Sequence, residues 1–231
     1  MSVPTAVVAC VGKRVLAPGV YELRLSKPIG FKFLPGQFVL FDVPSLEDPA
    51  DVQPRAYSIA SSPAEDELLF VIKLVRNGRA SAWVERAVEP GTPVVLRGPF
   101  GRFTLDLGTT KDYLFVATGT GIAPLRSQIL WNARERGDAR RMHLAVGVLR
   151  PEDRFWQEEW SVLRSQFPQL SVNSFVLQEG QSLLAHLPQV VEDFTGVSVY
   201  LCGAPETVQA LKGNCMDWGV PKHDLHAESY M

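Results

Sequence analysis

Residues 55–58 in the first half of the chain, Arg-Ala-Tyr-Ser, combine side chains that suit an aromatic ligand carrying phosphate. The planar guanidinium of Arg55 can pair with a phosphate, the Tyr57 ring can lie on an aromatic ring system, and the Ser58 hydroxyl can bond a ring nitrogen. Because side chains alternate along a strand, Arg55 and Tyr57 are expected on one face and Ser58 on the other, unless the strand bends. By spacing alone, a surface arginine beside a half-buried tyrosine is the stronger interpretation of this segment.

Residues 78–81, Gly-Arg-Ala-Ser, form a second candidate phosphate site because they open an expected helix over residues 80–87. The first N–H groups of a helix lack intrahelical partners and carry partial positive charge, so they attract anions. Ser81, near the start of this helix, is also an ordinary N-cap residue. The two interpretations are compatible, because an anion docks at the same end of a helix that a cap residue occupies.

Two glycine-containing turns in the second half of the chain each follow an apolar strand and open a helix. They comprise Gly119, Thr120, Gly121 and Pro124 in the first turn, and Cys202 and Gly203 in the second. Glycine lets the backbone approach a ligand closely, and the following helix N-terminus attracts a pyrophosphate. The first turn departs from the GxGxxG pattern of dinucleotide sites and is weak evidence by itself. However, the carboxyl ends of neighbouring parallel strands face one crevice, so the pair of turns predicts a nucleotide site.

The elements that position residues 55–58 and 78–81 are short β-segments separated by proline and glycine. The expected strands cover residues 20–25, 37–43, 56–61, 67–75 and 92–97, and the helix at 80–87 interrupts them. Leu23 alternates with Glu22 and Arg24, so each strand is expected to have one buried face. Many short strands with turns between them predict a small antiparallel β-barrel.

The two glycine-containing turns lie in a region of different rhythm, where apolar strands alternate with helix-length amphipathic segments. The expected strands are 113–118, 142–149, 170–177 and 197–202, and the expected helices are 122–136, 153–167, 183–191 and 205–218. This alternation predicts a Rossmann-like α/β domain, a parallel sheet with helices on both faces. A short linker at residues 107–111 separates the two regions, so the predicted domains are 1–108 and 109–231.

The overall composition argues against several classes of partner. A formal net charge of −2 leaves no basic stripe for nucleic acid. The longest apolar runs, 68–74 and 113–117, are far shorter than the ~20 residues of a membrane-spanning helix. The first residues place their positive charges after a short apolar run, which is the reverse of a secretory signal, so a cytoplasmic location is expected.

The three cysteines, Cys10, Cys202 and Cys215, are widely spaced. A disulfide framework or a structural zinc site needs paired or clustered cysteines, and a cysteine-ligated iron–sulfur cluster needs four thiolates. We therefore expect no metal site in this chain.

Taken in order, these motifs and the segment Gly-Pro-Phe-Gly at residues 98–101 resemble the ferredoxin–NADP reductase superfamily over nearly the whole chain. The resemblance implies FAD, in preference to FMN, as the cofactor. In that family the arginine of this motif binds the flavin phosphate, the tyrosine stacks on the isoalloxazine, the serine reaches N5, and the GxxS turn binds the pyrophosphate. The flavin-binding residues implied here are Arg55, Ala56, Tyr57, Ser58, Val71, Ile72, Lys73, Gly78, Arg79, Ala80 and Ser81.

The same resemblance assigns the two glycine-containing turns to NADH or NADPH and puts Cys202 close to the nicotinamide. For Cys202 an inert buried thiol is an equally open interpretation. Residues 226–230, His-Ala-Glu-Ser-Tyr, resemble the terminal Glu-x-Tyr of plant-type reductases, although Met231 follows here. The implied role of Tyr230 is a displaceable lid on the flavin, and the alternative is a chain end packed on the sheet. The implied catalytic group is Ser58, Cys202, Glu228 and Tyr230.

Coenzyme preference can be argued from residues 177–179, Leu-Gln-Glu. Reductases of this family that prefer NADPH often carry a Ser-Arg pair at this place, where the arginine meets the 2′-phosphate. An acidic side chain repels that phosphate and can accept a ribose hydroxyl, which favours NADH. Arg150 is the counter-observation, because it ends the preceding strand and could bind a phosphate. Its other interpretation is an exposed loop arginine.

The resulting hypothesis is a monomeric reductase that moves a hydride from NAD(P)H to FAD and then passes electrons to a separate ferredoxin-like or oxygenase protein. A second hypothesis is an NAD(P)H:flavin reductase, whose acceptor is free flavin. A third, from another class, is a binding module without turnover. The hydride step needs no general acid or base, and the four scattered histidines suggest no proton relay.

Overall fold

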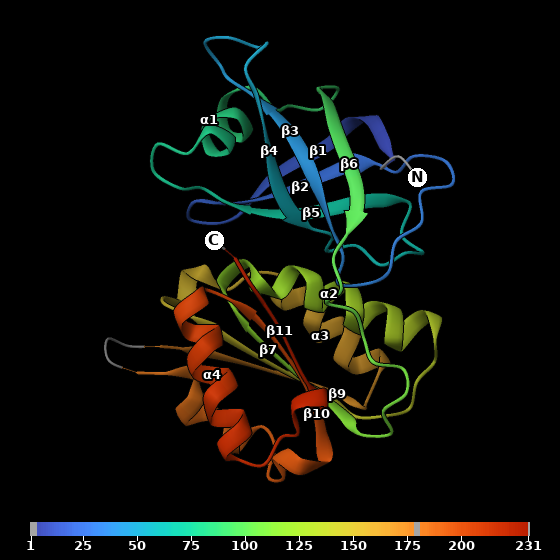
Figure 1. Cartoon of the computed structure of the whole chain (residues 1–231), viewed down its shortest axis with the longest axis vertical. Helices are drawn as coiled ribbons and strands as arrows, with labels where there is room; N and C mark the ends of the chain where they lie inside the picture. The colour runs from blue at the N-terminus through green and yellow to red at the C-terminus, as the bar shows by residue number, and fades with distance from the viewer. Residues whose placement is uncertain (1–3, 178–180, 231) are drawn as a thin grey trace.

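The computed structural model describes residues 4–177 and 181–230, and it contains two β-sheets that follow one another along the longest axis of the molecule (Figure 1). The first sheet is antiparallel and has six strands in the order β4-β3-β6-β1-β2-β5. Its strands are β1 (Thr5–Ala17), β2 (Val20–Ser26), β3 (Phe38–Pro44), β4 (Val52–Ser58), β5 (Glu67–Lys73) and β6 (Pro93–Phe100). It curls around one apolar core, against which α1 (Arg79–Arg86) packs through Trp83 and Val84. This confirms the predicted antiparallel barrel.

The longest strand of the barrel, β1, was not among the expected strands. Its inward positions hold Val8 and Cys10, whereas Val7, Val11 and Val15 are exposed. Because apolar residues occupy both faces, the polar–apolar alternation that identifies a half-buried strand is missing. The strand β4 also begins earlier than expected, at Val52, and includes Pro54. It lies at the end of the strand order, where a missing N–H is tolerated.

The second sheet is parallel and has five strands in the order β11-β10-β7-β8-β9. Its strands are β7 (Asp112–Thr118), β8 (Met142–Val148), β9 (Leu170–Val176), β10 (Val197–Gly203) and β11 (Leu225–Ser229). The α-helices are α2 (Ile122–Leu130), which a π-helical turn (Trp131–Glu135) continues, α3 (Gln157–Gln166) and α4 (Pro205–Asp217). Short 3-10 turns cover Gly119–Gly121, Pro151–Asp153, Leu183–Gln189, Phe194–Gly196 and Lys222–Asp224. The predicted Rossmann-like α/β architecture is confirmed.

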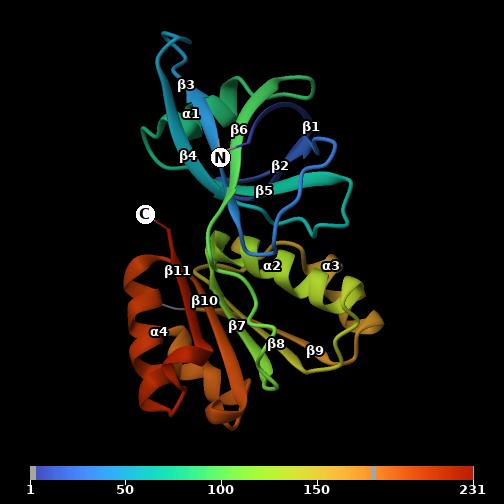
Figure 2. The same cartoon turned by 45° about the vertical axis from the view of Figure 1, so that its right-hand side comes forward.

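Helices cover both faces of this sheet, as the alternation along β7 shows. Phe115 and Ala117 belong to the core formed with α2 and α3, whereas Leu114 and Val116 belong to the core formed with α4. Figure 2 shows α2 directly beneath the barrel and α4 on the other side of the sheet. The carboxyl ends of β7 and β10 therefore point toward the barrel, and the helix that follows β7 lies against it.

Several element limits differ from the sequence-based expectations. α3 begins at Gln157 rather than residue 153, because a 3-10 turn precedes it and Trp156 has a positive φ of 58°. The segment expected as a helix at 183–191 is a 3-10 turn that contains Pro188. β11 was not expected as a strand, and it extends the sheet beside β10.

The connection between the sheets runs from Phe100, the last residue of β6, to Asp112, the first residue of β7. The boundary predicted between residues 108 and 109 falls in this connection, and its position stays a prediction. Across residues 4–177 and 181–230, no helix combines the length and apolar character that a membrane crossing requires.

Candidate active site

The two sheets meet where Ser58, the last residue of β4, contacts Glu228 near the end of β11 and Tyr230 just after it. The Tyr230 Oη donates a hydrogen bond to Ser58 Oγ at 3.1 Å, and Ser58 Oγ donates to Glu228 Oε1 at 3.3 Å. Ser58 is 8% exposed, so this small polar group lies in a site largely closed to bulk water. A hydroxyl and a carboxyl of the parallel-sheet half are thereby joined through a single serine oxygen of the barrel.

Cys202 joins this cluster from β10. The pairing of β10 with β11 puts Cys202 directly opposite Glu228, and the Cys202 side chain shares a hydrogen bond with Tyr230. Burial raises the pKa of the Cys202 thiol, so the thiol is neutral at physiological pH. The structure thus brings all four predicted catalytic residues together, and it makes Cys202 both buried and adjacent to the others.

Tyr230 is packed on the sheet and also reaches the barrel, while its role as a lid stays a prediction. Its backbone N–H donates to the Gly203 carbonyl at 3.0 Å, so the chain end is packed on the sheet. Its half-buried ring nevertheless reaches across to Ser58 on the barrel. Burial raises the pKa of Tyr230 well above its usual range, so the phenol remains a hydrogen-bond donor.

Within the cluster, Cys202 and Tyr230 stay neutral at physiological pH, so Glu228 is the group whose charge can change. Burial raises the pKa of the Glu228 carboxyl, and the hydrogen bond from Ser58 opposes this rise without cancelling it. The carboxyl therefore keeps its proton to a higher pH than an exposed glutamate does.

On the barrel side, Tyr57 is held by an aromatic neighbour. Its ring centroid lies 4.9 Å from that of Phe41 with the planes tilted by 41°, and burial raises the pKa of Tyr57 to about 12. Arg55 is exposed and donates to the Pro54 carbonyl at 2.8 Å and to Gln53 Oε1 at 2.7 Å. Both acceptors are neutral, so these contacts leave its charge available to a phosphate.

The start of α1 differs in one respect from its prediction. Gly78 is the N-cap residue, so the N-cap interpretation of Ser81 is wrong. The Ser81 hydroxyl instead accepts a hydrogen bond from the Val75 N–H at 2.7 Å and fixes the turn before the helix. Because glycine has no capping side chain, the first N–H groups of α1 remain accessible to an anion.

A groove of about 660 Å³ borders this helix end, and it fits the second half of a dinucleotide cofactor. Its walls are the loop after β3 and the segment from Leu74 to Arg86. Arg79 crosses the groove and pairs with Asp51 through its side chain and carbonyl. A phosphate at α1 would therefore compete with Asp51 for Arg79.

Other predicted flavin-binding residues differ in what they can offer. The side chains of Val71, Ile72 and Ala80 are buried in the apolar cores, so only their backbone atoms can touch a ligand. Lys73 and Ala56 are exposed.

The two glycine-containing turns are adjacent, as predicted, because β7 and β10 are neighbouring strands. A Cβ on Gly121 would collide with the Cys202 carbonyl, and a Cβ on Gly203 would collide with the Thr118 side chain. Only glycine allows this approach of the two strand ends. The arrangement brings the turn Gly119–Gly121 and the start of α2 next to the end of β10, and a helix start of this kind suits a pyrophosphate. Pro124 is buried in the first turn of α2 and has no N–H to donate.

Arg150, which was predicted as a phosphate ligand, is already paired with acidic side chains. Its exposed guanidinium donates to Asp153 at 2.9 and 3.2 Å, and it lies 3.6 Å from a Glu152 oxygen. Two carboxylates therefore already compensate its charge. Gln178 and Glu179, on which the coenzyme argument depends, lie outside the described residues, so coenzyme preference stays a prediction.

Three buried polar residues of α2 were not among the predicted functional residues. Arg126, Ser127 and Gln128 are all buried although their side chains are polar. The available signal was three consecutive polar residues within the apolar run of 122–130, because a helix buried on all sides must give such groups partners. Those partners lie on the barrel, as described below.

Comparison with known proteins gives a consistent result. The model of an oxidoreductase FAD-binding domain matches residues 18–105, and that of an oxidoreductase NAD-binding domain matches residues 115–212. The chain is 31% identical over 237 residues to ferredoxin–NADP reductase B of Sorangium cellulosum, covering 95% of each chain. It is 32% identical to the ferredoxin–NAD(P)+ reductase component of a naphthalene 1,2-dioxygenase system from Pseudomonas putida, covering 90% of this chain but 63% of that one.

Solved structures share the fold at low identity. An Amycolatopsis cytochrome P450 reductase superposes with a TM-score of 0.84 at 22% identity, covering 99% of this chain and 71% of that one. A Neisseria gonorrhoeae ferredoxin NADP+ reductase with bound FAD and NADP gives a TM-score of 0.83 at 20% identity, covering 97% and 98%.

Proposed function

Because the chain belongs to the ferredoxin–NADP reductase superfamily and carries an FAD-binding and an NAD-binding domain, we propose that it moves a hydride from NADH to FAD and passes electrons to a separate protein. The acceptor in this proposal is a ferredoxin-like protein or an oxygenase component. The single observation that carries it is the cluster in which Ser58 of the barrel meets Glu228 and Tyr230 of the parallel-sheet half. A monomeric state and a cytoplasmic location stay predictions.

The chain's own residues have distinct tasks in this reaction. FAD, when bound, would supply the redox chemistry of hydride acceptance. Tyr57 and Arg55 would hold the flavin ring and its phosphate, and Ser58 Oγ would lie at the reacting edge. The glycine-containing turns would bind the pyrophosphate of the nicotinamide coenzyme and so fix the position of its ring.

Tyr230 is proposed as a lid that leaves its place when the nicotinamide binds. Its side chain is held by the hydrogen bonds to Ser58 and Cys202. Such bonds contribute about 0.5–1.5 kcal/mol each, so an incoming aromatic ring can replace them. Once Tyr230 has moved, Ser58 Oγ keeps its bond to Glu228, and the serine would relay a proton between the carboxyl and a group at the reacting edge, taking up one proton as it gives up another.

NADH is the proposed coenzyme, and this part rests on the chain's own residues. The segment 177–179 stands where reductases that prefer NADPH often carry a Ser-Arg pair, and its Glu179 would repel a 2′-phosphate. Arg150 is already paired with Asp153. One relative is named for NADP and another for NAD(P)+, so their names leave the preference open.

The proposal is tested by purifying the protein and assaying its acceptors. The expected result is yellow protein with one FAD per chain that oxidises NADH and reduces a ferredoxin faster than it reduces free flavin. Colourless protein that rapidly reduces added FMN or riboflavin would replace the proposal with a free-flavin reductase. Protein that binds FAD and NADH without turnover would indicate a binding module.

A further inference from the structure

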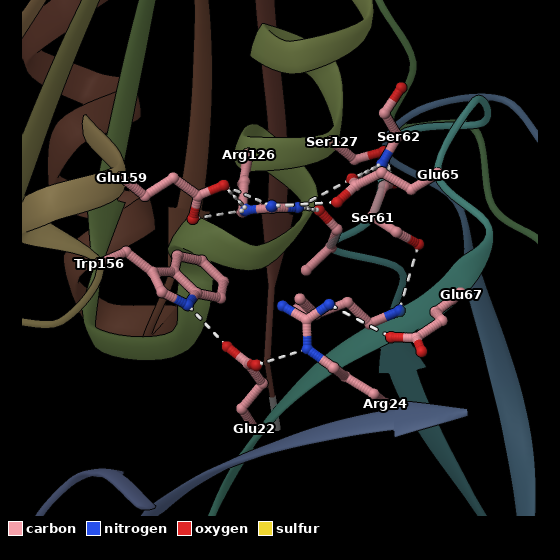
Figure 3. Close-up of polar contacts among 12 residues, drawn as sticks. Glu22, Arg24, Ser61, Ser62, Glu65, Glu67, Arg126, Ser127, Trp156 and Glu159 are labelled. Carbon is pink, nitrogen blue, oxygen red and sulfur yellow. Dashed lines mark hydrogen bonds and ion pairs between the residues drawn. The ribbon is translucent and has the colours of Figure 1, made fainter. Parts of the chain in front are cut away.

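Arg126 on α2 lies at the centre of a buried polar network between the barrel and the parallel-sheet half (Figure 3). Its side chain is 3% exposed. The guanidinium donates to the Ala60 carbonyl at 2.6 Å and to both Glu65 oxygens at 3.1 and 3.2 Å, all on the barrel side. It also donates to Glu159 of α3 at 3.1 Å. One planar cation therefore joins the barrel, α2 and α3.

The next two residues of α2 repeat this contact with the barrel. Ser127 Oγ donates to the Ser61 carbonyl at 2.6 Å, and Gln128 Nε2 donates to the Phe103 carbonyl at 2.6 Å. Hydrogen bonds are directional, so bonds to fixed backbone carbonyls define how far α2 lies from the barrel and how it is rotated.

Trp156, just before α3, forms a second arm of the network. Its Nε1 donates to Glu22 Oε2 at 2.8 Å, and Glu22 is 1% exposed although strand alternation predicted it on an outer face. The parallel-sheet half covers that face, and Arg14 and Arg24 pair with Glu22 there. Although burial alone would raise it, hydrogen bonds from these three neighbours hold the pKa of Glu22 below its usual value, so the carboxylate is charged.

The backbone at Trp156 supports a constrained role. A φ of 58° is uncommon for an aromatic residue and persists only where neighbouring groups hold the backbone in place. The Trp156 ring lies 5.2 Å from the Arg126 guanidinium, so the two arms of the network touch.

The network is close in sequence to one segment on each side of the candidate active site. Ala60 and Ser61 follow Ser58 on the flavin side, and Arg126 follows Gly121 within the same helix start on the nicotinamide side. A displacement of either segment would move the groups that hold the two reacting rings.

We propose that Arg126, supported by the Trp156–Glu22 arm, is a positioning residue that sets the separation and angle between the flavin-binding and nicotinamide-binding halves. This inference rests on the proposed function. Hydride transfer needs reacting atoms about 3–3.5 Å apart, and a misplacement of about 1 Å can lower the rate about 100-fold. Buried ion pairs contribute little net stability over apolar packing but fix geometry, so geometry is the role this network supports.

The first experiment compares three variants with a matched control in the FAD-loaded enzyme. Arg126→Met removes the central cation, Trp156→Phe removes one donor, and Ser127→Ala removes one hydroxyl. The control is Lys111→Met, which breaks a buried ion pair with Asp224 inside the parallel-sheet half. Stopped-flow reduction by NADH, its isotope effect with 4-deuterated NADH, the nicotinamide–flavin charge-transfer absorbance and the Tm are measured for each.

The expected result is that Arg126→Met slows flavin reduction at least about tenfold, raises the isotope effect and weakens the charge-transfer band. Trp156→Phe and Ser127→Ala should change the reduction rate, the isotope effect and the charge-transfer band in the same direction by smaller factors. These two variants keep the test decisive if Arg126→Met does not fold. Lys111→Met should lower the Tm without changing the reduction rate, the isotope effect or the charge-transfer band. The proposal would be overturned if the folded interface variants kept the wild-type rate of flavin reduction and the wild-type charge-transfer band. It would also be overturned if Lys111→Met lost as much of both as the interface variants do.

A second measurement separates this inference from the proposed function. Hydrogen–deuterium exchange of peptides covering residues 60–62 and 126–128 reports the interface without any turnover. Faster exchange of both segments in Trp156→Phe, but not in Lys111→Met, supports the positioning role, whereas unchanged exchange contradicts it. If the wild-type enzyme oxidises neither NADH nor NADPH, the proposed function fails, and exchange alone decides whether the network orders the interface.

Discussion

Ser58 and Tyr230 are 172 residues apart in the chain, yet the Tyr230 Oη donates a hydrogen bond to Ser58 Oγ across the junction of the two halves. This bond requires the last residue of β4 to lie next to the last residues of β11 in space. It therefore depends on the packing of α2 against the barrel and on the parallel addition of β11 to β10. The candidate active site is in this sense a product of the interdomain contact rather than of either half.

Removing the Ser58 hydroxyl should slow hydride transfer without unfolding the protein. Ser58 Oγ bridges Tyr230 and Glu228, so Ser58→Ala leaves both without their partner at the reacting edge. We expect a fall in the flavin reduction rate of roughly 10- to 100-fold, measured by stopped-flow absorbance. The control is Ser62→Ala, because Ser62 Oγ is buried without a hydrogen-bond partner in the described structure. An equal effect in both variants would contradict a specific role for Ser58.

Truncating the lid should tighten nicotinamide binding. Tyr230→Ala removes the ring and its hydrogen bonds to Ser58 and Cys202, which the nicotinamide must otherwise replace. The cost removed is about 1–3 kcal/mol, which corresponds to a roughly 5- to 150-fold lower Kd for the coenzyme. Titration of oxidised enzyme with NAD+ measures it, and Tyr230→Phe keeps the ring as the control. An unchanged Kd in Tyr230→Ala would show that Tyr230 does not obstruct the nicotinamide.

Glu228 should make stability depend on pH. Burial raises the pKa of this carboxyl in the folded protein above its usual value of 4.5. The folded state therefore favours the protonated form, and this contribution to the free energy of unfolding is present below pH 4.5 and lost as pH rises through the raised pKa. Glu228→Gln should accordingly be more stable than wild type at pH 7, with the difference shrinking toward pH 4. Thermal unfolding between pH 4 and 8 measures it, and parallel Tm profiles would refute the assignment.

Retention of FAD should depend on Tyr57 and Arg55. Tyr57→Ala removes the ring held beside Phe41, and Arg55→Ala removes an exposed cation whose described hydrogen-bond acceptors are neutral. Each is expected to weaken FAD binding by about tenfold or more, seen as a lower ratio of FAD to protein after gel filtration. Arg97→Ala, which loses a pair with Asp42 in the same sheet, is the matched control. Unchanged FAD ratios in Tyr57→Ala would remove its proposed stacking role.

Periodicity predicted most of the architecture because most strands have a regular apolar pattern. The parallel strands β7, β8 and β10 are almost wholly buried, and their sequences are correspondingly continuous apolar runs. The strand β1 escaped because exposed Val7, Val11 and Val15 hide its alternation. The start of α3 was predicted at the wrong residue because the positive φ of Trp156 depends on partners that are distant in sequence.

The nucleotide site at the two glycine-containing turns was predictable from strand order, whereas the cluster of Ser58, Glu228 and Tyr230 was predictable only by resemblance. No spacing rule relates Ser58 to Tyr230, and the ordered motifs of a known superfamily supplied that link. The buried positions of Glu22 and Arg126 were out of reach for a physical reason, since a charged residue is expected outside unless a specific partner is known. Trp156 reaches Glu22, and Ala60 and Glu65 reach Arg126, from the other half of the molecule, which local patterns do not describe.

Coenzyme preference is the last prediction, and residues 177–179 carry it. Wild-type enzyme should show a higher kcat/KM for NADH than for NADPH, because Glu179 repels a 2′-phosphate. Introducing Leu177→Ser with Gln178→Arg should raise kcat/KM for NADPH by roughly 10- to 100-fold, the range that a charge-assisted arginine–phosphate contact supplies. Arg150→Gln should change the preference little, because Asp153 already pairs with this arginine. A strong NADPH preference in the wild type that Arg150→Gln abolishes would reverse the argument and make Arg150 the phosphate ligand.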